Sequence, residues 1–202
     1  MSEPSHSQKS LVNVDDCVLV VIDIQDHFLN KYDQAKTQNL ISNVVWLIQV
    51  AEHLDVPVVA MGEDIDHNGA LNQTIQAALP KGTQVHDKDF FDLTSNPEIM
   101  AAVDATGRKT AVCVGMETDV CVAQSAINIL AAGYNVVTLR DAVASMDADE
   151  EVGLGRMRDA GVAISSVKAL YYEWLRSVSR LVNLGNKVPE LKTTLRPSGL
   201  VL

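Results

Sequence analysis

Short runs of β-branched and aliphatic residues alternate along this chain with longer segments in which apolar residues recur at helical spacing. The runs are almost continuously apolar, as in Val18–Ile22, which is typical of strands covered by helices on both faces. Between residues 36 and 54, Leu40, Val44 and Leu47 recur on one helical face. The alternation favours an α/β fold: a three-layer, doubly wound, mainly parallel six-stranded sheet with helices on both faces.

The expected elements follow from these patterns and from helix-stopping glycines such as Gly133 and Gly161. We expect strands at 18–23, 56–61, 83–86, 110–114, 135–139 and 162–165. We expect helices at 36–54, 70–79, 97–105, 119–132, 148–159 and 166–177. The chain then divides into a flexible leader (1–10), one folded domain (11–180), and a tail (181–202) that is either disordered or an arm packed on a neighbouring subunit.

Composition excludes several classes of partner. The chain has 202 residues, a formal charge of −10 and only 16 basic residues without a cluster, so we expect no nucleic-acid partner. Its apolar runs are far shorter than the roughly 20 residues of a membrane-spanning helix, so we expect no membrane partner. Without a secretory segment at the start and with three unpatterned cysteines, we expect a cytoplasmic protein.

The stretch from Thr110 to Ser125 carries the strongest indication of chemistry. It predicts a buried strand, a sharp turn at Gly115, and a helix that opens near Thr118 or Asp119. Cys121 then lies in the first helical turn, where unpaired N–H groups and the positive end of the helix dipole favour a thiolate. A cysteine in such a place can have a lowered pKa and act as a nucleophile. The other two cysteines are expected to be small buried side chains.

Two further reactive groups are expected at the carboxyl edge of the sheet, where ligands bind in such folds. Asp23 closes the first strand, and Lys88 follows the third. Each has an ordinary alternative, a turn or cap residue for Asp23 and a solvated loop residue for Lys88. Together with Cys121 they make a coherent set: the carboxylate takes the thiol proton, the ammonium group stabilises charge, and the thiolate attacks a carbonyl carbon.

The chain resembles the isochorismatase-like cysteine hydrolases over roughly residues 18–177. The resemblance rests on Val-Ile-Asp-Ile-Gln in the first strand, the lysine before an aromatic pair, Gly-Met-Glu-Thr-Asp-Val-Cys-Val, and the segment that follows. The family's Asp–Lys–Cys triad maps onto Asp23, Lys88 and Cys121. The resemblance also implies a cis peptide bond between Met116 and Glu117, and an oxyanion hole formed by the N–H groups of Glu117 and Cys121.

Departures from the family pattern narrow the expected activity. Nicotinamidase-type members bind a metal through an Asp-x-His motif and a further histidine. Here Asp64, Asp66 and His67 are present, but not in that order or spacing, so we predict no metal and no other cofactor. Relatives that cleave isochorismate replace the nucleophilic cysteine, so the presence of Cys121 favours hydrolysis of an amide.

These observations predict a cysteine amidohydrolase that cleaves an amide-type C–N bond of a small molecule through a thioester intermediate. The expected pocket walls are Phe28, Phe90, Phe91 and the acidic Glu117. One alternative is a metal-dependent, nicotinamidase-like amidase that uses the 64–67 loop. Another is a non-catalytic binding or scaffold protein with a hydrolase fold. The resemblance further implies a homo-oligomer.

Overall fold

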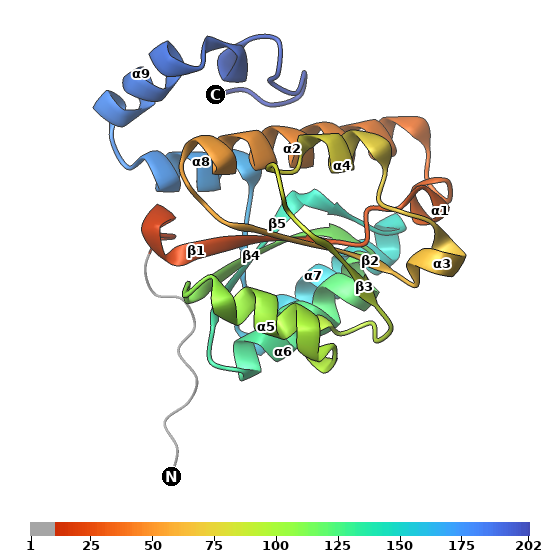
Figure 1. Ribbon diagram of the computed structural model, residues 1–202. Helices are drawn as coiled ribbons and strands as arrows, with labels where there is room; N and C mark the ends of the chain where they lie inside the picture. The colour runs from red at the N-terminus through yellow and green to blue at the C-terminus, as the bar shows by residue number, and fades with distance from the viewer. Residues whose placement is uncertain (1–10) are drawn as a thin grey trace.

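A computed structural model describes residues 11–202 and shows a single six-stranded sheet between two layers of helices (Figure 1). All neighbouring strands pair in parallel, in the order β3-β2-β1-β4-β5-β6. The strands are β1 (Cys17–Ile22), β2 (Val58–Glu63), β3 (Val85–Lys88), β4 (Thr110–Met116), β5 (Asn135–Ala144) and β6 (Ala163–Ser165). This architecture confirms the predicted fold class. The predicted leader, 1–10, lies outside the described residues.

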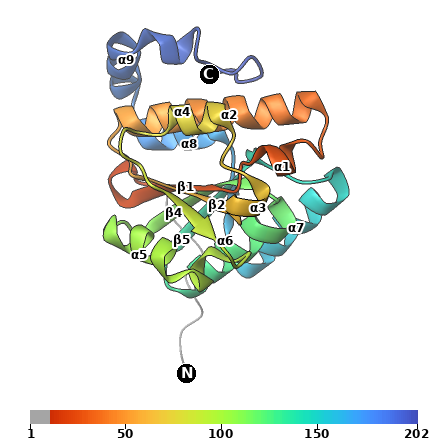
Figure 2. The same cartoon turned by 45° about the vertical axis from the view of Figure 1, so that its right-hand side comes forward.

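Helices cover both faces of the sheet, and this explains why β1 is apolar throughout. Figures 1 and 2 show α2, α4 and α8 on one face and α5, α6 and α7 on the other. Leu19 and Val21 pack into the core under the first layer, whereas Val20 and Ile22 pack into the core under the second. The α-helices are α1 (Asp26–Leu29), α2 (Gln34–His53), α3 (Ile65–Asn68), α4 (Gln73–Ala78), α5 (Pro97–Ala105), α6 (Ala123–Ala131), α7 (Asp147–Ala160), α8 (Val167–Leu175) and α9 (Val178–Lys187).

Shorter helical turns connect these elements. The 3-10 turns are η1 (Val14–Asp16), η2 (Leu93–Ser95) and η4 (Pro189–Lys192), and η3 (Thr118–Val122) is a π-helical turn. The helix predicted at 119–132 is therefore divided into η3 and α6. Across residues 11–202, none of the helices combines the length and the apolar character needed to cross a membrane.

Four strands extend further toward the carboxyl edge than the sequence predicted. β2 continues to Glu63, β3 to Lys88, β4 to Met116 and β5 to Ala144. The turn predicted at Gly115 is wrong, because this glycine lies inside β4. Its φ is +128°, and a Cβ atom there would lie 1.9 Å from the carbonyl oxygen of Ile22. Glycine is needed at this position so that the backbones of β1 and β4 can approach each other.

The C-terminal tail, predicted to be either disordered or an arm on a neighbouring subunit, packs on its own chain. Ser177 caps α9 by accepting a hydrogen bond from the N–H of Arg180. The indole N–H of Trp46 in α2 donates to the carbonyl of Leu191 at 2.7 Å, and Leu200 near the C-terminus is buried. Figure 1 shows this segment lying beyond α2 and α8. Of the two predicted alternatives, an ordered segment is the one that agrees with these contacts.

Candidate active site

Four strand ends bring polar side chains to the same edge of the sheet. Asp23 follows β1, Glu63 ends β2, Lys88 ends β3, and Cys121 lies in η3 just after β4. Because these strands are parallel and adjacent, their carboxyl ends meet. Glu63 and Lys88 are also direct partners in the register of β2 and β3. The order of the chain reverses between β1 and β4, the place where sheets of this type bind ligands.

Asp23 sits in a strained turn immediately after β1. Its φ is +50°, a left-handed conformation that is uncommon for a residue with a side chain. Its backbone N–H donates to the carbonyl of Met61 in the neighbouring strand at 3.1 Å, and its own carbonyl accepts from the N–H of Gln25. Its carboxylate is buried and lies 2.9 Å from the ammonium group of Lys88. Burial raises the pKa of Asp23 to about 7, although Lys88 opposes this rise.

Lys88 is completely buried and connects the other polar groups. Its Nζ donates to the backbone carbonyls of Phe90 at 3.1 Å and Phe91 at 3.2 Å, and lies 3.6 Å from the sulfur of Cys121. Burial disfavours the charged form, but the charges of Asp23, Cys121 and Glu63 and the hydrogen bond to Asp23 together outweigh this effect and raise the pKa of Lys88. The side chain is therefore an ammonium ion, fixed by carbonyl and carboxylate oxygens.

Cys121 lies near the middle of the site with 4% of its surface exposed. The peptide bond between Met116 and Glu117 just before η3 is cis. Burial, reinforced by the charge of Asp23, raises the pKa of the Cys121 thiol, and Lys88 only partly offsets this. The lowered pKa expected from the sequence is therefore not observed, because burial and the nearby carboxylates dominate over the helix terminus. A protonated thiol in this position needs a base to become a nucleophile.

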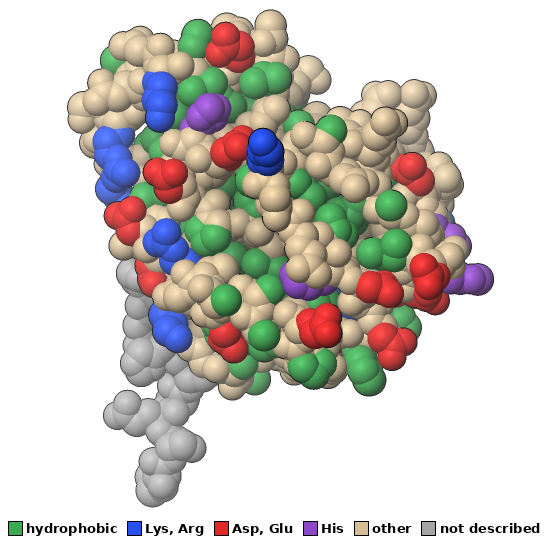
Figure 3. All heavy atoms as spheres, in the orientation of Figure 1, with side chains coloured by type: hydrophobic (Ala, Val, Ile, Leu, Met, Phe, Trp, Pro, Cys, Tyr) green, Lys and Arg blue, Asp and Glu red, His purple; other side chains and the backbone are tan. Residues whose placement is uncertain are grey.

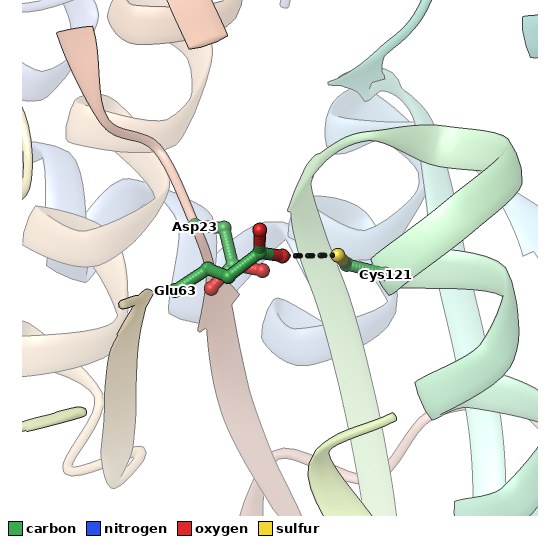
Figure 4. Close-up of side chains that lie close together, drawn as sticks. All are labelled: Asp23, Glu63 and Cys121. Carbon is green, nitrogen blue, oxygen red and sulfur yellow. Dashed lines mark hydrogen bonds between the residues drawn. The ribbon is translucent and has the colours of Figure 1, made fainter. Parts of the chain in front are cut away.

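Glu63 contacts the thiol and was not predicted as a site residue. The sulfur of Cys121 donates to Oε2 of Glu63 at 3.1 Å, and Figure 4 shows the Glu63 carboxylate reaching toward the sulfur with Asp23 next to it. The predicted second strand ended at 61, which assigned Glu63 to a polar loop. The missed signal is the apolar run of β2 continuing through Gly62, with a carboxylate at its end.

Gly153 in α7 allows this helix to pack closely against η3. A Cβ atom on Gly153 would lie 2.7 Å from the Cα of Asp119. The backbone of η3 therefore packs directly on α7. The side chain of Asp119 also accepts a hydrogen bond from the hydroxyl of Ser145 at 2.6 Å, just after β5. These contacts fix the backbone of η3, the turn that carries Cys121, and the sequence did not indicate them.

The predicted pocket residues differ in their exposure to solvent and in their contacts. Phe28 is buried, with the ammonium group of Lys31 4.7 Å from its ring centre. Phe90 and Phe91 are 54% and 52% exposed. The carboxylate of Glu117 accepts a hydrogen bond from the Tyr32 hydroxyl at 2.8 Å and pairs with Lys31 at 3.4 Å. Burial, together with Glu117, raises the pKa of Tyr32, which keeps its hydroxyl a donor.

The 64–67 loop does not join the site. Asp64, Asp66 and His67 are exposed, and Figure 3 shows acidic and histidine side chains at the edge of the molecule where Figure 1 places α3. Within residues 11–202, the groups close enough to share a metal ion belong to Asp23, Glu63 and Cys121, with ligand atoms within 4.8 Å of one another. The Lys88 ammonium lies 2.9 Å from Asp23 and 3.5 Å from Glu63, so it provides the positive charge there. This donor set fits a bound metal poorly.

The chain matches the isochorismatase domain family over residues 17–169. Isochorismatase family protein 1B from Dictyostelium discoideum is 25% identical over 169 residues, covering 80% of this chain and 79% of that protein. Among solved structures, MAR1 ribonuclease from Caenorhabditis elegans has a TM-score of 0.82 and 24% identity, over 96% of this chain and 98% of that chain.

Other solved structures share the fold. The YcaC gene product from Escherichia coli, an octameric hydrolase of unknown specificity, has a TM-score of 0.80 and 21% identity, over 94% of this chain and 97% of that one. N-carbamoylsarcosine amidase from Thermoplasma acidophilum has a TM-score of 0.64 and 19% identity, over 75% of this chain and 96% of that one. At these identities the structures show the fold alone. The family match spans three quarters of the sequence, and the chain belongs to the isochorismatase family of hydrolases.

Proposed function

We propose that this protein is a cysteine-dependent hydrolase that cleaves an amide-type C–N bond of a small molecule through a thioester intermediate. The observation that carries the proposal is the contact of one ammonium group with both partners of the triad. Nζ of Lys88 lies 2.9 Å from Asp23 and 3.6 Å from the sulfur of Cys121. Such an arrangement can hold a thiolate next to a positive charge while a carbonyl compound approaches. The membership of a hydrolase family supports the same reaction class.

The reaction requires an attack by sulfur, expulsion of nitrogen and hydrolysis of the thioester. Cys121 supplies the sulfur, and Lys88 stabilises its negative charge. Asp23 holds Lys88 in place and neutralises its charge in the resting site. The N–H groups of Glu117, just before η3, and of Cys121, within it, are the proposed hydrogen-bond donors. They would stabilise the negative charge that forms on the carbonyl oxygen of the substrate.

The proposed pocket is lined by Phe28, Phe90, Phe91 and the side chain of Glu117. The exposed rings of Phe90 and Phe91 offer apolar contacts, and the Glu117 carboxylate offers an acceptor for the N–H groups of an amide. The exposure of the two phenylalanine rings also supports a homo-oligomer in which they are covered. Native mass spectrometry tests this; a purely monomeric protein at micromolar concentration would reject it.

The direct test is turnover by wild type and Cys121→Ala on a panel of small primary amides and N-carbamoyl compounds, read as release of ammonia. We expect the variant to lose turnover by at least about a thousandfold while its unfolding curve stays cooperative. Cys113→Ala is the matched control, because Cys113 is buried in β4 away from the edge of the sheet. Equal turnover in purified Cys121→Ala and wild type would reject the proposal.

A further inference from the structure

We propose that Glu63 is the catalytic base of this enzyme and accepts the proton of Cys121. Asp23 then positions Lys88 and keeps it protonated. The inference rests on the proposed cysteine-hydrolase function and assigns the proton transfer within it. Its starting point is the hydrogen bond from the Cys121 thiol to Oε2 of Glu63, at 3.1 Å. In this hydrogen bond the thiol proton of Cys121 is directed toward the carboxylate oxygen that would accept it.

The two carboxylates of the site share Lys88 as a partner but differ in their distance from it and in their exposure. Asp23 faces the ammonium group of Lys88 at 2.9 Å, and its side chain is 1% exposed. Glu63 lies further from the same ammonium group, at 3.5 Å, and its side chain is 15% exposed. A base in a hydrolase must receive a proton from the nucleophile and later pass it to the leaving group or exchange it with water. The partial exposure of Glu63 permits this exchange, whereas Asp23 is enclosed.

Lys88 is equally close to both ends of the proposed proton transfer. Its Nζ is 3.5 Å from Oε2 of Glu63 and 3.6 Å from the sulfur of Cys121. When the proton moves from sulfur to oxygen, the negative charge moves from Glu63 to Cys121. Because the ammonium group is at nearly the same distance from both, its attraction to that charge is retained throughout the transfer. The attraction of Lys88 therefore does not oppose the proton transfer.

A buried glutamine holds Glu63 in position. Gln25 is fully buried, and its side-chain oxygen accepts from the backbone N–H of Glu63 at 2.7 Å. Its Nε2 donates to the carbonyls of Glu63 at 2.9 Å and Gly69 at 2.6 Å. A Cβ atom on Gly62 would lie 3.1 Å from Ile65 and 3.2 Å from Gln25, so the preceding backbone is tightly packed as well. Gln25 is thus a positioning residue for the base.

The proposed steps balance in atoms and electrons. The S–H bond of Cys121 breaks, its proton goes to Glu63, and the sulfur electron pair forms a bond to the substrate carbonyl carbon while the C=O π pair moves to oxygen. The oxyanion then collapses, the C–N bond breaks, and nitrogen takes the proton from Glu63. Water attacks the thioester, giving its proton to Glu63. The C–S bond breaks, the acid product leaves, and Cys121 recovers the proton.

The test is the pH dependence of Cys121 alkylation by iodoacetamide in intact protein, which needs no knowledge of the substrate. In wild type, intramolecular transfer to Glu63 makes the rate nearly constant between pH 7.5 and 9. In Glu63→Gln the proton must leave to solvent, so the rate rises about tenfold per pH unit, and at pH 7.5 it is at least about tenfold below wild type. Glu98→Gln removes an exposed carboxylate and leaves the wild-type profile unchanged.

Two further variants separate the roles of the carboxylates. Glu63→Asp keeps a carboxylate on a shorter side chain, so we expect a slower reaction with the flat profile restored. Asp23→Asn also keeps the flat profile between pH 7.5 and 9, at a lower rate, because the proton acceptor is still present. A flat profile in a folded Glu63→Gln, or a tenfold rise per pH unit in Asp23→Asn alone, would overturn the assignment and make Asp23 the base.

The outcome also distinguishes this inference from the proposed function. If Cys121 in wild type reacts no faster than glutathione at every pH, the cysteine-hydrolase proposal fails. If wild type reacts fast with a flat profile that Glu63→Gln retains, the hydrolase proposal stands and the assignment of Glu63 fails. Circular dichroism of each variant establishes that the comparison is made between folded proteins.

Discussion

The ammonium group of Lys88 lies 2.9 Å from a carboxylate oxygen of Asp23, and both side chains are closed off from solvent. The pair joins the end of β3 to the end of β1 across β2. Two charges buried in this way persist only because each compensates the other. This ion pair therefore determines how the site responds to substitution and to pH.

Replacing Lys88 by methionine would leave the Asp23 carboxylate without its cation. We expect a loss of roughly 3 kcal/mol in the free energy of unfolding at neutral pH. The thiol of Cys121 would also lose its nearest positive charge, so its pKa would rise and its alkylation would slow. Urea unfolding and iodoacetamide kinetics measure both effects, with Lys81→Met as a control because Lys81 is exposed. Unchanged alkylation kinetics in Lys88→Met would contradict the role of this residue.

The stability of the protein depends on pH through Asp23. Burial raises the pKa of Asp23 from its ordinary 3.8 to about 7 in the folded protein. Between these values the folded protein keeps a proton that the unfolded chain releases, so the free energy of unfolding falls as the pH rises. We expect wild type to lose about 2–3 kcal/mol between pH 5 and 7.5 relative to Asp23→Asn. Parallel pH profiles for the two proteins would contradict this prediction.

The close contact of β1 and β4 makes Gly115 irreplaceable. Alanine would place its Cβ 1.9 Å from the carbonyl oxygen of Ile22, at a φ of +128°. We expect Gly115→Ala to cost more than about 4 kcal/mol or to prevent folding. Gly133→Ala is the matched control: its φ is +96°, but nothing lies within 4 Å, so only about 1 kcal/mol should be lost. Similar denaturation midpoints for the two variants would show that the close approach is absent.

The site should work without a metal ion. Lys88 supplies the positive charge that a metal would otherwise bring to Asp23, Glu63 and Cys121. Treatment with a chelator should therefore leave both the alkylation rate of Cys121 and the melting temperature unchanged. Elemental analysis is the companion measurement. Stoichiometric zinc, iron or manganese, with activity lost on its removal, would instead favour the metal-dependent amidase.

The sequence predicted the sheet and three site residues because their signals are local. A continuously apolar strand followed by an acid, as at Asp23, and a cysteine after a strand–helix turn can be read from neighbouring residues. Parallel strands then bring such ends together without further information. Lys88 was placed in the same way, although its strand was predicted to end two residues too early.

The remaining features depend on contacts that a local pattern does not contain. Glu63 is a site residue because β2 continues two residues further than predicted and pairs in register with Lys88. The hydrogen bond from the side chain of Gln25 to the carbonyl of Glu63 joins residues that are 38 positions apart in the sequence. The raised pKa of Cys121 results from burial against carboxylates brought from other strands. Tertiary packing decides each of these outcomes.

The most direct test of the central claim is alkylation of the native protein with iodoacetamide at pH 7.5, followed by mass spectrometry of the cysteine peptides. The chain contains its own references, because Cys17 and Cys113 are free cysteines that are completely buried in β1 and β4. The account predicts that Cys121 is modified first, at least about tenfold faster than glutathione, and that Lys88→Met loses this advantage. Modification of Cys121 no faster than a free thiol would contradict an assembled nucleophile.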